Sequence, residues 1–230
     1  MTLVFIISAP SGSGKSTLVE RVRQIVPDLE FSISYTTRPP RGHEQNGKEY
    51  CFVSREEFAG MVARGEFLEH ADVFGNFYGT TTRFLKEAER KGHDLLLDID
   101  VQGAEQIKRK LPEAVSIFIL PPDRRTLEAR LRHRSLDAEQ VIQRRLVTAS
   151  REIENYEKYD YILVNDRLEE SIDGLAAILL AERLKRSAAP QSATNAQILA
   201  KAERFRLVHV RDRLQPILAS FSTAATTGGR

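Results

Sequence analysis

Residues 9–17 combine glycine, lysine and hydroxyl side chains directly after the apolar residues 3–7. The stretch reads Ala9-Pro10-Ser11-Gly12-Ser13-Gly14-Lys15-Ser16-Thr17. A glycine-rich turn between a strand and a helix points successive backbone N–H groups at an anion, at the positive end of the helix. In such a motif the lysine reaches the β- and γ-phosphates of a nucleotide and the next hydroxyl holds Mg²⁺. We therefore predict a nucleotide-phosphate site here, although Ala9 replaces the first glycine of the pattern G-x-x-x-x-G-K-[ST].

A second set of polar and aromatic residues lies between residues 34 and 80. Arg38 and Arg41 flank two consecutive prolines, which stiffen the chain so that both guanidinium groups can hold one anion. Small hydroxyls, tyrosine hydroxyls and one carboxylate accompany them, and together they suit a nucleoside monophosphate: Ser34, Tyr50, Glu69, Tyr78 and Thr80.

Two acidic residues follow the apolar run 95–97. Asp98 and Asp100 are two positions apart, so they lie on the same side of a strand. Ligands of parallel sheets bind at the carboxyl ends of the strands. We expect both carboxylates to face the nucleotide site.

Arginines are concentrated between residues 123 and 151. At about 100° per residue, one apolar arc of the helix expected there contains Val141, Leu146, Ala149, Ile153 and Tyr156, and Arg145 falls inside that arc. A desolvated guanidinium needs a carboxylate or a phosphate. An intramolecular salt bridge would satisfy Arg145, but the phosphate site elsewhere in the chain favours a phosphate.

Short apolar runs at residues 95–99, 115–120 and 161–164 alternate with helical patterns. This alternation predicts a parallel sheet covered by helices. Residues 31–83 interrupt it with glycine, proline, threonine and aromatic residues and one helical piece near 55–64, which indicates an inserted subdomain.

The chain of 230 residues has a single cysteine, so it has no internal disulfide framework, and no apolar run is long enough to span a bilayer. We expect a cytoplasmic protein with no membrane partner. From Lys185 onward eight Lys or Arg face two acids. We interpret this basic tail as a solvated helix over about 196–214 with a disordered end; the alternative is nucleic-acid binding, for which no RNA-binding signature is present.

These motifs resemble those of the guanylate kinase family over about residues 1–185. The resemblance rests on residues 9–17, Ser34 to Arg41, Tyr78-Gly79-Thr80, Asp98 to Gly103 and Val164-Asn165-Asp166. It implies an α/β fold of the P-loop NTPase type, with a parallel sheet flanked by helices, an inserted GMP-binding subdomain and a mobile lid. The implied division is core 1–31, GMP-binding subdomain 32–83, core 84–122, lid 123–151, core 152–186 and a C-terminal extension 187–230.

The resemblance also implies roles for single residues. Arg38, Arg41, Tyr50 and Tyr78 would hold the GMP phosphate. Glu69 would bind the guanine edge, because a carboxylate accepts from guanine N1–H and the 2-amino group side by side. The other implied GMP-binding residues are Ser34, Thr80, Asp98 and Asp100.

On the ATP side, the resemblance places Arg134 and Arg145 over the phosphates and Arg130 and Asn165 near the adenine. This chain departs from the family in the lid, where Arg132-His133-Arg134-Ser135 replaces the usual Arg-Gly-Arg-Gly. The remaining implied ATP-binding residues are 9–17, with Ser16 on the metal.

The implied reaction moves the γ-phosphoryl group of ATP to GMP, and also to dGMP, with Mg²⁺ as cofactor and Lys15, Arg38, Arg134 and Arg145 as catalytic residues. It would serve purine nucleotide metabolism; a homo-oligomer is left open. A related P-loop kinase such as ribose 1,5-bisphosphate phosphokinase is an alternative that Glu69, Thr80 and the Arg38/Arg41 pair disfavour. A non-catalytic guanylate-kinase-like protein-binding module is another, disfavoured by Lys15 and the lid arginines.

Overall fold

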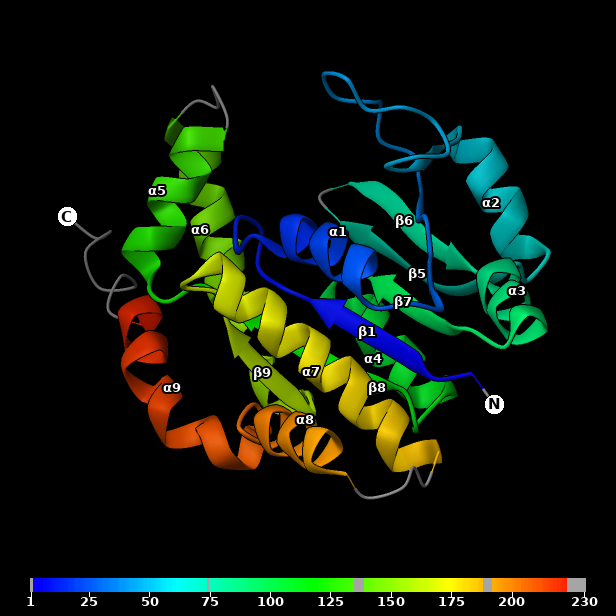
Figure 1. Ribbon diagram of the computed structural model, residues 1–230. Helices are drawn as coiled ribbons and strands as arrows, with labels where there is room; N and C mark the ends of the chain where they lie inside the picture. Colours follow the sequence, from blue (N-terminus) through cyan, green and yellow to red (C-terminus); the bar gives the residue numbers. More distant parts are fainter. Residues whose placement is uncertain (1, 74, 135–138, 188–191, 223–230) are drawn as a thin grey trace. The chain divides into compact units, whose positions relative to one another are not determined.

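The computed structural model describes residues 2–73, 75–134, 139–187 and 192–222 (Figure 1). The chain divides into two compact units. The first contains Met1–Ile7 and Asp28–Val115, and the second contains Ser8–Pro27 and Ser116–Arg230.

Parallel strands form the core of the first unit. β7 (Asp94–Asp98) lies between β2 (Leu29–Phe31) and β1 (Val4–Ser8), with Val4 opposite Leu95 and Leu29 opposite Asp94. The side chains of residues 95–97 are fully buried. A strand that is apolar on both faces must be covered on both, and helices α3 (Thr82–Lys91) and α4 (Val101–Lys110) flank β7 in the sequence.

The same unit carries a second sheet within residues 32–83. Its strands are β3 (Tyr35–Thr36), β4 (Cys51–Phe52), β5 (Phe67–Val73) and β6 (Asn76–Thr81), in the order β4-β3-β6-β5. Helix α2 (Arg55–Ala63) begins after Ser54, whose hydroxyl accepts from the Glu57 backbone N–H. Phe58 and Met61 of this helix pack with Phe67 of β5 in a small apolar core, and the helix predicted near residues 55–64 is confirmed.

The second unit contains β8 (Val115–Leu120) paired in parallel with β9 (Tyr161–Val164), with Ile117 opposite Tyr161. Every residue of β8 is buried. Its helices are α1 (Lys15–Ile25), α5 (Arg124–Arg134), α6 (Glu139–Ile153) and α7 (Leu168–Ser187), with a short 3₁₀ turn at Tyr156–Lys158.

The C-terminal extension differs from the sequence prediction of one helix over about 196–214. It forms two helices, α8 (Ala193–Glu203) and α9 (Leu207–Ser222). The break has a clear cause: the Phe205 carbonyl accepts from the Ile162 backbone N–H, and the Leu207 N–H donates to the Asp160 carbonyl. Because these backbone groups bond outside the helices, residues 204–206 leave the helical path. The predicted disordered end begins at Ser222, which is the last residue of α9, and residues 223–230 lie outside the described residues.

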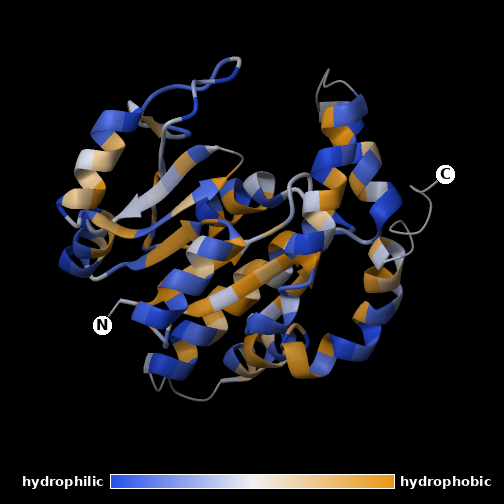
Figure 2. Cartoon of the chain, turned by 180° about the vertical axis from the view of Figure 1, so that it is seen from behind, coloured by the Kyte–Doolittle hydropathy of each residue, from blue (hydrophilic) through white to orange (hydrophobic). Residues whose placement is uncertain are grey.

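The predicted fold class, parallel strands flanked by helices, is confirmed. Figure 2 shows the strands of the parallel sheet as largely hydrophobic and β6 as paler, while the helices carry hydrophilic residues along part of their surface. Among the residues that the structure describes, no helix has the length and apolar character needed to cross a bilayer.

Candidate active site

The glycine-rich turn of the second unit joins Ser8, the end of β1, to Lys15, the start of α1. Gly12 and Gly14 have φ angles of 93° and 86°, in the left-handed region that favours glycine. A side chain on Gly14 would also overlap the amide nitrogen of Asn165. Both the backbone conformation and the close approach therefore require glycine at this position.

Two side chains from later in the chain contact this turn, and a third contacts one of them. Arg145 Nη2 of α6 donates to Ser11 Oγ at 2.7 Å, and Asn165 Nδ2, just after β9, donates to the Ser13 carbonyl at 2.7 Å. Arg130 Nη2 of α5 donates to the Asn165 carbonyl at 2.9 Å. The second unit thus brings together Arg130, Arg145 and Asn165 around the turn.

Two buried polar atoms in this region have no hydrogen-bond partner among the described residues: Arg130 Nη1 and Ser13 Oγ. Buried polar groups are normally paired, so such atoms mark a place where a polar ligand completes the structure. The exposed hydroxyls of Ser16 and Thr17 follow in the first turn of α1.

The buried stripe of α6 differs from the predicted arc at both ends. Tyr156 lies beyond α6, in the 3₁₀ turn, and is half-buried. Ile142, not Val141, is buried with Leu146, and Val141 is 40% exposed. The stripe follows the i, i+4, i+7, i+11 spacing through Ala149 and Ile153, which puts Val141 on its far side. Arg145 lies at the edge of the stripe, half-buried, and from there it reaches the turn.

In the first unit, Arg38 is the centre of one polar cluster and is only 6% exposed. Its Nε donates to the Tyr78 hydroxyl at 3.2 Å, and Nη1 and Nη2 donate to the two carboxylate oxygens of Glu44 at 2.9 and 3.0 Å. The Tyr50 ring lies 5.2 Å from the guanidinium carbon. Burial lowers the pKa of Arg38, but the bonds with Glu44 and Tyr78 outweigh it and raise the pKa above its usual value.

Glu69 of β5 is the centre of a second cluster in this unit and is 3% exposed. Burial raises the pKa of Glu69 to about 7, and the nearby charge of Asp100 adds to the rise. Thr80 lies opposite Glu69 across β5 and β6. A Cβ on Gly103 would lie 2.5 Å from Glu69 Oε2, so the carboxylate packs directly against the first turn of α4. Asp100 caps that helix and accepts from the backbone N–H groups of Gln102 and Gly103.

Strand β6 connects the two clusters. Tyr78 of the Arg38 cluster and Thr80 of the Glu69 cluster are two residues apart on β6, so their side chains lie on the same face. A cationic group and a carboxylate are thereby held along one strand. This arrangement suits a ligand with an anionic end and a hydrogen-bond-donating end.

The remaining predicted residues of the first unit are Ser34, Arg41 and Asp98. Ser34 is half-buried and its carbonyl accepts from the Cys51 N–H. Arg41 is exposed, and its backbone N–H donates to Glu44. Asp98 ends β7 and is half-buried.

Comparison with known proteins supports one assignment. A sequence profile described as guanylate kinase matches residues 1–182. The chain belongs to the guanylate kinase family. It is 59% identical over 224 residues to a guanylate kinase of Koribacter versatilis, covering 96% of each chain, and 53% identical over 184 residues to one of Neisseria gonorrhoeae, covering 80% of this chain and 90% of the relative. The crystal structure of a guanylate kinase from Anaplasma phagocytophilum has a TM-score of 0.64 at 38% identity, covering 79% of this chain and 86% of that one.

Within this family member, one polar partner of the site was missed by the sequence reasoning. Glu44 binds Arg38 through both carboxylate oxygens and also accepts from the Arg41 backbone N–H. The available signal was an acid three residues after Arg41, in a segment already assigned to anion binding. Lone acids in loops are common, so this signal is weak.

The predicted lid arginine Arg134 is the last residue of α5, and its side chain lies outside what the structure describes. Residues 135–138, which include part of the altered lid sequence, also lie outside it. The role of Arg134 in this family member therefore stays a prediction.

Proposed function

We propose that this chain transfers the γ-phosphoryl group of ATP to GMP, giving ADP and GDP, and that dGMP is a second acceptor. The observation that carries the proposal is the buried Glu69 carboxylate, held on the same sheet as the Arg38 cluster. The first unit would bind the monophosphate and the second unit would bind ATP.

Glu69 supplies the base selection. Its carboxylate accepts hydrogen bonds, and guanine offers N1–H and the 2-amino group side by side. Adenine has an unprotonated N1 at that position, so the buried Glu69 carboxylate would face another hydrogen-bond acceptor. Sites that depend on such polar pairing reject the wrong ligand by about 10⁴ or more.

The Arg38 cluster supplies the phosphate site. Among the described residues, Pro39, Glu44 and Tyr78 use four of the five N–H groups of Arg38, which leaves one N–H on Nη2 for a phosphate oxygen. Glu44 fixes the plane of the guanidinium, which favours one direction of approach. The hydroxyls of Tyr50 and Tyr78 and the exposed Arg41 would complete the phosphate contacts.

The glycine-rich turn supplies the ATP site. Its backbone N–H groups and Lys15 would hold the phosphates, Arg130 and Asn165 would face the adenine, and Arg145, with Arg134, would stabilise the charge that develops during transfer. The acceptor is already an anion, so these residues act by alignment and charge neutralisation, without a general base.

A divalent metal is expected with ATP in this family, and we propose Mg²⁺. No group of three or more His, Cys, Asp or Glu among the described residues could form a protein metal site. Mg²⁺ does not need one, because it commonly keeps several waters and binds substrate phosphates with one or two protein oxygens. The exposed Ser16 hydroxyl fits that role. When bound, the ion neutralises phosphate charge.

The test is a product analysis of the purified chain with ATP, Mg²⁺ and GMP. ADP and GDP should appear in equal amounts, and ADP formation should nearly stop when GMP is left out. Lys86→Ala, at an exposed position of α3, serves as an unaffected control. ADP without GDP would indicate a nucleotide hydrolase and contradict the proposal.

A further inference from the structure

Residues 193–222 lie beyond residue 182, where the family match ends, yet they pack tightly onto the second unit. Helix α9 contacts α5, α6 and β9. It buries the side chains of Val210, Leu214 and Phe221. The extension is therefore an integral part of this unit.

The turn between α8 and α9 is anchored on β9. The two backbone bonds described above form an antiparallel bridge between Arg206 and Tyr161. Phe205 packs on α7, where a Cβ on Gly174 would lie 2.6 Å from Phe205 Cζ. The absence of a side chain at Gly174 makes room for the Phe205 ring.

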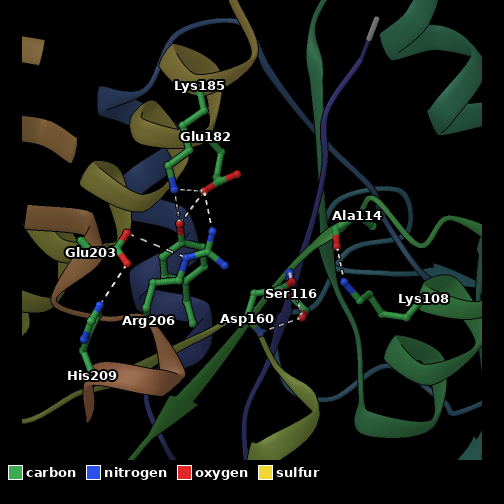
Figure 3. Close-up of polar contacts among 10 residues, drawn as sticks. Lys108, Ala114, Ser116, Asp160, Glu182, Lys185, Glu203, Arg206 and His209 are labelled. Carbon is green, nitrogen blue, oxygen red and sulfur yellow. Dashed lines mark hydrogen bonds and ion pairs between the residues drawn. The ribbon is translucent and has the colours of Figure 1, made fainter. Parts of the chain in front are cut away.

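Charged side chains reinforce this anchor (Figure 3). The Arg206 guanidinium lies 4.7 Å from the centre of the Tyr161 ring and 3.9 Å from Glu182 of α7. The Tyr161 hydroxyl donates to Glu182, and Lys185 also donates to this carboxylate. Burial raises the pKa of Tyr161, which keeps its hydroxyl a donor.

The other end of the extension meets the first turn of α5. Ser220 Oγ of α9 accepts from the Arg124 backbone N–H at 3.1 Å and donates to the Ile217 carbonyl at 2.6 Å. The first N–H groups of a helix have no partner within it. Asp123, directly before α5, accepts from the Thr126 N–H. The Arg124 N–H is instead capped by Ser220, which lies outside the predicted lid at residues 123–151.

Helix α5 connects this cap to the ATP side. A Cβ on Gly12 would lie 2.8 Å from Leu131 and 3.0 Å from Leu127, so α5 packs directly against the glycine-rich turn. Arg130, on the same helix, bonds the Asn165 carbonyl. A change in the position of α5 would therefore alter the shape of the turn and the direction of Arg130.

We propose that the C-terminal extension is a positioning element for ATP binding, in which Ser220 fixes the start of α5 and thereby holds that helix against the glycine-rich turn. The kinetic test of this inference, which compares the KM values for ATP and GMP, rests on the proposed function. Ser220 is a positioning residue, since it acts through α5. The candidate GMP residues belong to the other unit, so the effect should be selective for ATP.

The test compares Ser220→Ala with Ser222→Ala in the full chain. Ser222 is on the same helix, but its hydroxyl donates to the Leu218 carbonyl within α9. Loss of the Ser220 cap should raise the KM for ATP roughly three- to tenfold, which corresponds to the free energy that a capping hydrogen bond typically contributes. The KM for GMP should stay within about twofold of wild type. Ser222→Ala should match wild type, and Ser220→Thr, which keeps the hydroxyl, should restore most of the ATP affinity.

Hydrogen exchange gives a readout that needs no turnover. Ser220→Ala should speed exchange at the start of α5, at residues 124–127, and weaken ATP binding in a titration without GMP. If GMP phosphorylation failed but these two effects were present, the proposed function would fall and the positioning role would stand. Identical ATP affinity and α5 exchange in the two alanine variants, or an equal rise in both KM values, would overturn the inference.

Discussion

Replacing Glu69 with glutamine should separate recognition from stability. The carboxylate is 3% exposed and burial raises its pKa from the ordinary 4.5 to about 7. A carboxyl with a raised pKa binds a proton more tightly in the folded than in the unfolded state, so its contribution to folding is lost as the pH rises from about 4.5 to 7. Above pH 7 the ionised Glu69 therefore costs roughly 3 kcal/mol of folding free energy.

Glu69→Gln removes this cost because glutamine stays neutral. At pH 8 the variant should unfold at a higher temperature than wild type, by about 6 to 12 °C for a chain of this size, and the advantage should vanish near pH 4.5. Thermal unfolding at several pH values measures this. Glu56→Gln, an exposed position on α2, is the control and should show no such gain.

The same substitution should remove guanine recognition. In wild type only the ionised carboxylate accepts both guanine donors, so the KM for GMP should rise about tenfold between pH 8 and pH 6. The GMP phosphate also titrates near this range, but equally for both proteins, so the ratio of their KM values isolates Glu69. The reasoning would be refuted if the KM of wild type for GMP changed between pH 6 and pH 8 as that of Glu69→Gln does. It would also be refuted if Glu69→Gln were no more stable than wild type at pH 8.

Three further changes test other parts of the site. Lys15→Ala should nearly abolish turnover, as measured by coupled ADP release; substantial remaining activity would remove Lys15 from the ATP site. Arg145→Ala should lower kcat by about 10³ to 10⁵ with a folded protein by circular dichroism, and a loss below tenfold would show that its bond to Ser11 is only structural. Gly103→Ala places a methyl group 2.5 Å from Glu69 Oε2 and should raise the KM for GMP while leaving that for ATP unchanged; parallel changes in both would indicate general destabilisation.

Much of the fold was predictable because buried strands and glycine-rich turns are encoded locally. The apolar runs at 115–120 and 161–164 correspond to β8 and β9 residue for residue. Helical periodicity also predicted that Arg145 lies on the packed side of its helix, and its side chain donates to Ser11 of the glycine-rich turn. Its contact with a phosphate stays a prediction. The boundary of that face was wrong at Val141, since a position at the edge of a stripe is decided by packing with other elements.

Features that depend on distant segments were not predictable. The division of the extension into α8 and α9 follows from backbone bonds between Phe205 and Ile162 and between Leu207 and Asp160. Nothing in the local sequence around residue 205 indicates an edge strand as a partner. Glu44 was missed for a different reason: it is close to Arg38 in the sequence, but its importance comes from the burial of Arg38, which the sequence does not reveal.

The most direct test of the account is a panel of nucleoside monophosphates in a coupled ADP-release assay with saturating ATP and Mg²⁺. We predict rapid turnover with GMP, slower turnover with dGMP and rates near background with AMP, CMP and UMP. The preference for GMP over AMP should be about 10⁴ and should collapse in Glu69→Gln. Comparable rates with AMP and GMP in the wild-type chain would contradict the account.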